Sequence, residues 1–172
     1  MHSWMPYFRS FAVNWDREDG TYARHPEDVV SRPADNFARH NAIAAFFGPG
    51  FGLDVTDGDR VMYEVWNRAS DLLLESDFYA LTEYSKSPES FYSIQFDCPE
   101  KGKGYIQGIR NTRCPHESWT VYPQGFEPGC SYAFENLETG EAFTKTGDEL
   151  LEHGFTMAMP KRTGYIWFYE KI

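Results

Sequence analysis

The residues of this sequence that could do chemistry are its carboxylates and its aromatic side chains. The 172 residues include 26 Asp and Glu, 14 Phe, 11 Tyr and 5 Trp. Two carboxylates that face each other across a cleft are the usual machinery of glycoside hydrolysis. Aromatic rings with polar neighbours are the usual platform for a sugar, because the rings pack on apolar C–H faces while polar groups bond to the hydroxyls. Chemistry on carbohydrates is therefore the first class to consider.

The opening segment brings these two residue types together. Trp4, Tyr7 and Trp15 lie in a run of apolar and aromatic residues, and Asp16 follows it directly. This is the local setting of a sugar-binding residue, so we take Trp4, Tyr7 and Asp16 as candidate substrate contacts. A solvated loop carboxylate is the alternative for Asp16. Spacing singles out no pair among the 26 acids, and we assign no catalytic residue.

Patterns that would indicate a phosphate site, a metal site or a serine nucleophile are missing. The sequence contains no glycine-rich phosphate loop, no HExxH zinc motif and no GxSxG nucleophile elbow. Asp54, Asp57 and Asp59 resemble part of a calcium loop, but their spacing fails the EF-hand register. Capping of the following helix is the simpler interpretation. We therefore expect no cofactor and no metal.

Three evenly spaced cysteines, Cys98, Cys114 and Cys130, need a separate interpretation. Zinc sites normally contain a closely spaced Cys pair, which this sequence lacks. Three thiols also cannot all form disulfides within one chain. We expect free thiols in or near strands. The alternative is a metal site with His116 as a further ligand, or a single disulfide.

Charge and hydropathy narrow the class of protein. Sixteen Lys and Arg against 26 Asp and Glu give a net charge of −10. This acidity, without a basic tract, argues against a nucleic acid or an anionic membrane as partner. No apolar run approaches the roughly 18 residues of a membrane-spanning helix. The first residues lack the pattern of a signal peptide, which together with the odd number of cysteines favours a cytoplasmic location.

The first half of the chain is predicted to alternate strands and helices. An aromatic run predicts a strand over 5–14, and Pro33 before a set of apolar residues predicts a helix over 34–46. A short strand or a turn is expected within 50–55. Residues 57–75 give the clearest helix, because their apolar side chains recur at a period of 3.6 residues. The apolar face of this helix is made of Val61, Met62, Val65, Trp66, Ala69, Leu72 and Leu73.

From about residue 90 the apolar period changes from 3.6 to two. Ile94 and Phe96 alternate with Gln95 and Asp97, which is the pattern of a strand. Several short segments of this type, bounded by Gly, Pro or Asn, predict an antiparallel sandwich. One helical turn is expected at 148–154. The further strands are expected at 104–111, 118–123, 130–137, 141–145, 154–160 and 164–171.

The aromatic residues of these elements are assigned to the core. Trp66 lies on the apolar face of the predicted helix, and Trp119 and Trp167 lie on predicted strands. Only the opening cluster of rings is left as a candidate for contact with a sugar. If the first half of the chain lacks its partner, some of the 30 aromatic rings are expected to be exposed.

Four segments resemble one enzyme family in the correct order. Residues 77–85, DFYALTEYS, are similar to the segment that follows the barrel in melibiase-type (raffinose-class) α-galactosidases. Residues 94–110, with IQFDCPE, two glycines and a final Ile-Arg, resemble a strand pair of that family. Residues 139–155, which contain TGE and TGDELLEHGF, are similar to its closing segment, and 164–171 fits its last strand. The resemblance covers residues 77–172 well and residues 1–76 loosely.

This resemblance implies a (β/α)8 catalytic barrel followed by an antiparallel β-sandwich. We therefore predict an α+β chain, with residues 1–86 as the last αβ units of the barrel and 87–172 as the C-terminal sandwich domain. The family's two catalytic aspartates lie in KWDxN-like and CxxGGGRxD-like segments, and neither occurs here. The resemblance thus implies a C-terminal fragment, or a truncated gene product, that is inactive by itself.

The function implied by the resemblance belongs to the whole enzyme. The family's reaction is the hydrolysis of terminal α-galactosides, without a metal. Within it, this chain would support and cap the catalytic barrel of the same enzyme. The alternative is a free-standing sandwich module without catalysis, which binds an oligosaccharide or forms a homo-oligomer. A structural domain without a ligand is a third interpretation.

Overall fold

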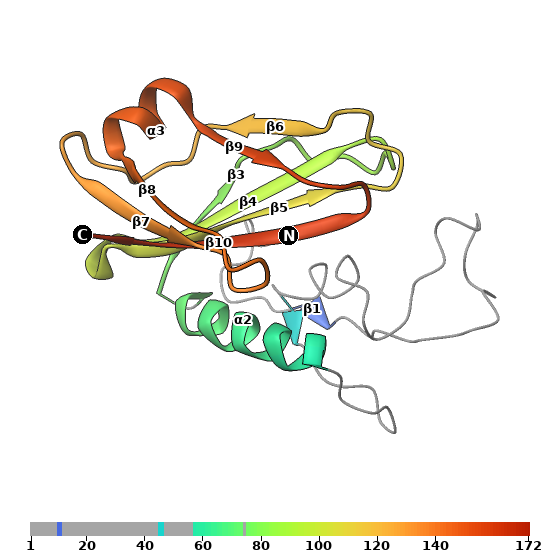
Figure 1. Ribbon diagram of the computed structural model, residues 1–172, viewed down its shortest axis with the longest axis horizontal. Helices are drawn as coiled ribbons and strands as arrows, with labels where there is room; N and C mark the ends of the chain where they lie inside the picture. Colours follow the sequence, from blue (N-terminus) through green and yellow to red (C-terminus); the bar gives the residue numbers. More distant parts are fainter. Residues whose placement is uncertain (1–9, 12–44, 47–56, 74) are drawn as a thin grey trace.

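The computed structural model describes residues 10–11, 45–46, 57–73 and 75–172 (Figure 1). Strand β1, Ser10–Phe11, lies within the strand predicted over 5–14 and pairs in parallel with β2, Ala45–Phe46. The helix predicted over 34–46 is therefore wrong at its end, because Ala45 and Phe46 are extended and bond to β1. The rest of that helix and the strand or turn predicted within 50–55 lie outside the described residues.

The helix predicted over 57–75 is confirmed as α2, Asp57–Leu73. Its apolar stripe faces the protein, and Met62, Val65 and Ala69 are buried. Polar side chains such as Glu64 and Asp71 occupy its exposed side. A helix of this pattern gains most of its stability by burying that stripe against another element.

The rest of the described chain is an antiparallel β-structure. A six-stranded sheet has the order β3-β4-β5-β10-β7-β8, and β6 pairs with β9 in a separate two-stranded sheet. The strands predicted from residue 90 onward are all confirmed within a few residues, whereas β3 was not predicted as a strand. The bounds are β3 Asp77–Ala80, β4 Phe91–Cys98, β5 Lys103–Arg110, β6 Ser118–Val121, β7 Ser131–Glu135, β8 Ala142–Thr146, β9 Phe155–Ala158 and β10 Thr163–Lys171.

The two sheets pack face to face, with β6 and β9 above the larger sheet in Figure 1. Between them lies a core to which both sheets contribute, for example Ile106 and Trp167 from the large sheet and Val121 and Met157 from the small one. Aromatic rings dominate this core, with Phe134 stacked on Phe155 at 5.2 Å between ring centroids. The antiparallel sandwich predicted from the sequence is thus present in the second half of the chain.

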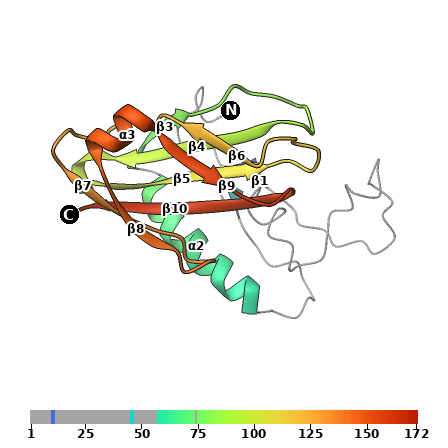
Figure 2. The ribbon, with the colours of Figure 1, turned by 45° about the horizontal axis from the view of Figure 1, so that its top comes forward.

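Helix α2 covers the opposite face of the large sheet, as Figure 2 also shows. Its Met62, Val65 and Ala69 form a second buried cluster with sheet residues such as Ile94 and Phe168. The central strands are therefore buried on both faces, and their side chains alternate between two cores. The predicted division at residue 86 remains a prediction, although α2 and β3, which precede it, both contact this sheet.

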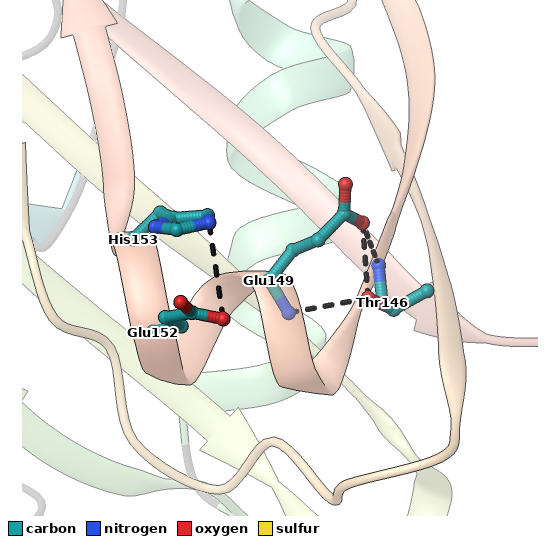
Figure 3. Close-up of polar contacts among 4 residues, drawn as sticks. All are labelled: Thr146, Glu149, Glu152 and His153. Carbon is teal, nitrogen blue, oxygen red and sulfur yellow. Dashed lines mark hydrogen bonds and ion pairs between the residues drawn. The ribbon is translucent and has the colours of Figure 1, made fainter.

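The predicted helical turn is present as α3, Gly147–His153, and it begins with a capping box. The backbone N–H of Glu149 donates to Thr146 Oγ1 at 3.2 Å, and the backbone N–H of Thr146 donates to Glu149 Oε2 at 2.8 Å (Figure 3). Hydrogen bonds from Thr146 lower the pKa of the Glu149 carboxyl. Each of these two backbone N–H groups thus finds an acceptor in the side chain of the other residue.

Gly104 in β5 is required by the close approach of two neighbours. A Cβ atom at this position would collide with the Phe96 carbonyl oxygen and would lie 2.5 Å from Tyr169 Oη. Neither neighbour can move freely, because one is backbone and the other is held by hydrogen bonds. Gly108, in the same strand, instead faces the sulfur of Met157 and the terminal methyl of Met159, at 2.6 and 3.0 Å.

We expect Gly104→Ala to lower the free energy of unfolding by about 2 kcal/mol or more, because overpacking a rigid site forces backbone shifts. Gly108→Ala is the matched control, and it should cost about 1 kcal/mol or less because methionine side chains can repack. Urea denaturation followed by tryptophan fluorescence measures both. Equal losses for the two variants would contradict the interpretation of Gly104.

Candidate functional site

The three residues predicted to contact a sugar, Trp4, Tyr7 and Asp16, lie outside the described residues. Their assignment stays a prediction. The other aromatic assignments can be compared with the structure. Trp167 is buried, with 4% of its surface exposed, and Trp66 packs half-buried against the cluster under α2. Trp119 is 36% exposed, so its assignment to the core is wrong, although its ring stacks on the buried Phe91 at 5.8 Å between ring centroids.

The best-developed polar cluster is built on the IQFD motif of β4. Because side chains alternate along a strand, Gln95 and Asp97 point into the sandwich while Ile94 and Phe96 point toward α2. Tyr169 Oη donates to Asp97 Oδ1 at 2.6 Å, and Gln95 Nε2 donates to Tyr169 Oη at 2.9 Å. Three polar side chains from the middle of the sheet therefore form one hydrogen-bonded chain.

The cluster also fastens the segment between β6 and β7. Gln95 Nε2 donates to the Gln124 carbonyl oxygen at 2.8 Å, and the Gln124 N–H donates to Gln95 Oε1 at 2.8 Å. Gly125 then lies directly on the Asp97 carboxylate, at a φ of 82° that a glycine adopts without strain. The side-chain amide of Gln95 thus bonds to both backbone polar groups of Gln124, in place of the strand that would otherwise pair with them.

Burial shifts the pKa values of both ionisable members of this cluster. Desolvation raises the pKa of Asp97 above its ordinary value, against the opposing effect of the hydrogen bond from Tyr169. Desolvation also raises the pKa of Tyr169, and the neighbouring Asp97 carboxylate raises it further. Both effects keep the Tyr169 hydroxyl protonated, so that it remains a donor to Asp97.

A second carboxylate lies next to this cluster, which raises the question of a hydrolytic pair. Asp77 in β3 stands opposite Asp97 in β4 in the strand register, and its negative charge contributes to the raised pKa of Asp97. However, Asp97 is only 5% exposed, with Tyr169 on one oxygen and Gly125 on the other. A sugar has no access to it. The cluster therefore holds the sandwich together and does not form a hydrolytic site.

Arg110 at the end of β5 has a comparable structural role. It is 5% exposed, and its guanidinium donates to the carbonyl oxygens of Met159 at 2.7 Å and Cys114 at 3.2 Å. These contacts tie the segment after β5 to the segment after β9. The three cysteines are free thiols, with Cys98 in β4 and the other two in connecting segments. Among the described residues no cluster of three or more metal-ligating side chains occurs.

An open polar groove lies between the C-terminal half of α2 and the sheet end formed by β5 and β10. It has a volume of about 420 Å³. The helix contributes Arg68 and Asp71, which share one face because they are three residues apart, and Glu75 follows just after the helix. The sheet contributes Lys103 and Glu170, which stand opposite each other in the strand register. The remaining lining residues are Leu72, Lys101, Gly104, Phe168 and Tyr169.

Two ion pairs involve residues that line this groove. Arg68 Nη1 lies 2.7 Å from Glu135 Oε2, and the same guanidinium lies over the Phe168 ring, 4.4 Å from its centroid. Lys101, in the short 3-10 turn Pro99–Lys101, pairs with Glu75 just after α2. No helix in the described part of the chain is long and apolar enough to cross a membrane.

Comparison with known proteins shows a likeness in structure where no likeness in sequence is found. Neither a family model nor a curated protein sequence matches. Solved structures do match over 78% of this chain: the galactosidase domain of the α-galactosidase–sucrose kinase AgaSK, with a TM-score of 0.58 at 12% identity, the α-galactosidase from Lactobacillus brevis, with 0.58 at 15%, and the GH36 α-galactosidase AgaB from Geobacillus stearothermophilus, with 0.57 at 15%.

These matches define a fold. The chain has the architecture of one part of GH36 α-galactosidases, and it spans only 19%, 20% and 19% of the three matched chains. The resemblance read from the four sequence segments is thereby confirmed. Two of those segments meet in the Gln95–Asp97–Tyr169 cluster, whose partners Gln124 and Gly125 no sequence pattern had indicated.

We expect Tyr169→Phe to lower the free energy of unfolding by about 3 kcal/mol, because it removes the hydrogen-bond donor of a buried carboxylate and one of the two hydrogen bonds that Gln95 Nε2 donates. Tyr165→Phe in the same strand is the matched control. That ring is half-buried, and its hydroxyl has no hydrogen-bond partner in the described structure, so about 0.5 kcal/mol or less is expected. Urea denaturation measures both losses, and similar losses would show that the cluster is unimportant.

The raised pKa of Asp97 gives a prediction about pH. A carboxyl group whose pKa is raised on folding contributes stability below its ordinary value of 3.8, and this contribution is lost as the pH rises through the folded-state value. Asp97→Asn cannot ionise. The unfolding free energy of the wild type minus that of Asp97→Asn should therefore fall as the pH rises above the ordinary carboxyl value of 3.8. A difference that rises over this range would mean that the folded protein favours the ionised carboxylate.

Proposed function

We propose that this chain is the C-terminal portion of an α-galactosidase-like glycoside hydrolase and that it supports and caps the catalytic barrel of that enzyme. The parent reaction is the hydrolysis of terminal α-galactosides. The observation that carries the proposal is the fold match to several α-galactosidases, each covering 78% of this chain and about a fifth of the matched one.

Three features of the chain itself support a supporting role. The buried Gln95–Asp97–Tyr169 cluster is structural, and its Asp97 carboxylate is closed to a sugar. The parallel pairing of β1 with β2 is the pairing that strands make in a (β/α)8 barrel. Tyr84 is 79% exposed, in the segment whose sequence resembles the family's connection between barrel and sandwich. A ring this exposed suits contact with another domain.

The experiment joins the chain to the protein encoded immediately upstream of Met1 and compares three proteins: the joined protein, the upstream part alone and this chain alone. On an aryl α-galactoside, we expect hydrolysis by the joined protein and none by this chain. The upstream part alone should melt at a lower temperature and lose activity, because its barrel lacks the sandwich. Hydrolysis by this chain alone, or an upstream sequence without a barrel, would overturn the proposal.

Two variants of the joined protein test whether this chain stabilises the barrel through a direct contact or is only covalently attached to it. Tyr84→Ser should lower the melting temperature of the barrel if this ring contacts it. Tyr122→Ser is the matched control, because this ring is also exposed, at 58%, but lies just after β6 in the small sheet. Circular dichroism of this chain alone shows whether either change affects the sandwich itself.

A further inference from the structure

We propose that the groove between α2 and the β5–β10 end of the sheet binds a neutral, polyhydroxylated ligand of the size of a mono- or disaccharide. The proposal goes beyond the supporting role and would hold for this chain with or without a barrel. It rests on the charge balance of the lining, on the side chains left available for bonding and on the size of the groove.

The lining excludes two classes of ligand. Its cations, Arg68, Lys101 and Lys103, equal its carboxylates, Asp71, Glu75 and Glu170, in number. A strongly charged ligand gains no net electrostatic attraction from a groove without net charge, so it has no reason to leave water. Charged walls also disfavour an apolar ligand, because its binding would desolvate them without compensation. A neutral molecule with many hydroxyl groups meets neither obstacle.

The side chains that remain available match what a hydroxyl group needs. Lys103 in β5 and Glu170 in β10 lie opposite each other on neighbouring strands. Neither side chain makes a hydrogen bond or ion pair with another described residue. Asp71 lies on the facing side of the groove; the pKa of the Lys101 amine is raised mainly by its hydrogen bond with Glu75, and the Asp71 charge adds to this. A sugar hydroxyl donates one hydrogen bond and accepts others, so it can bridge an ammonium and a carboxylate.

The frame around these side chains is already fixed. The ion pair with Glu135 and the contact with the Phe168 ring hold Arg68, and the ion pair with Glu75 holds Lys101. Ligand binding would therefore order Asp71, Lys103 and Glu170, whereas Arg68 and Lys101 already have their partners. The volume of about 420 Å³ lies within the range of about 300–1,000 Å³ of small-molecule sites.

The test is a titration of the isotope-labelled 172-residue chain with methyl α-galactoside and with melibiose, followed through the backbone amide signals. We expect saturable shifts at Leu72, Lys103 and Glu170. Asp71→Asn and Lys103→Met should each weaken binding by about tenfold or more, since hydrogen bonds to charged groups are the stronger ones. The matched controls are Glu89→Gln and Lys161→Met, which remove exposed charges elsewhere and should leave the affinity unchanged.

Three results would overturn the proposal. The first is the absence of saturable shifts in a chain whose thermal unfolding is normal. The second is a set of shifts that gathers at Trp119 and is abolished by Trp119→Ala, which would place the sugar on the exposed ring of β6. The third is equal loss of affinity in the groove variants and their controls. None of these results bears on the supporting role, which the joined protein tests separately.

Discussion

The hydrogen bond from Tyr169 to the buried Asp97 carboxylate is the interaction on which the arrangement of the sandwich depends. It joins the last strand of the chain to β4, and through Gln95 it extends to the segment that leads from the small sheet back to the large one. A buried carboxylate is costly without a partner, so each member of the cluster requires the others. Gly104 and Gly125 leave room for the cluster, because a side chain at Gly104 would collide with Tyr169 and one at Gly125 with Asp97. Five residues in four segments therefore depend on one another: Gln95, Asp97, Gly104, Gly125 and Tyr169.

The helices and strands of this fold could largely be predicted from the sequence, but the buried polar cluster between the sheets could not. The period of two along residues 92–98 predicts β4, and the 3.6-residue period predicts α2, because both patterns are local. The same pattern would place Gln95 and Asp97 at the surface, where polar residues usually lie. They are buried because their partners come from residues 124 and 169, and no local pattern reports a pairing at that distance. Trp119 shows the opposite case: its type and its place on a strand predict burial, but the ring is exposed.

One of the motifs that carried the family resemblance, in the segment 94–110, has a structural role. The Gln, Asp and Gly residues of the segment 94–104 hold Tyr169 and leave room for it. A motif of this kind identifies an architecture, and it gives no information about a reaction. The candidate site is correspondingly less predictable than the fold. The groove below α2 brings Asp71 together with Lys103 and Glu170 only after the helix has docked on the sheet, so its composition could not be read from spacing along the chain.

The central claim, that one buried polar cluster holds this sandwich together, is tested most directly by a double-mutant cycle. The free energies of unfolding of the wild type, Tyr169→Phe, Asp97→Asn and the double variant are measured by urea denaturation at one pH. Because the two side chains contact each other, we expect the double variant to be more stable than the sum of the single losses predicts, by about 1 kcal/mol or more. Additive losses within about 0.3 kcal/mol would mean that Tyr169 and Asp97 act independently, and would contradict the account.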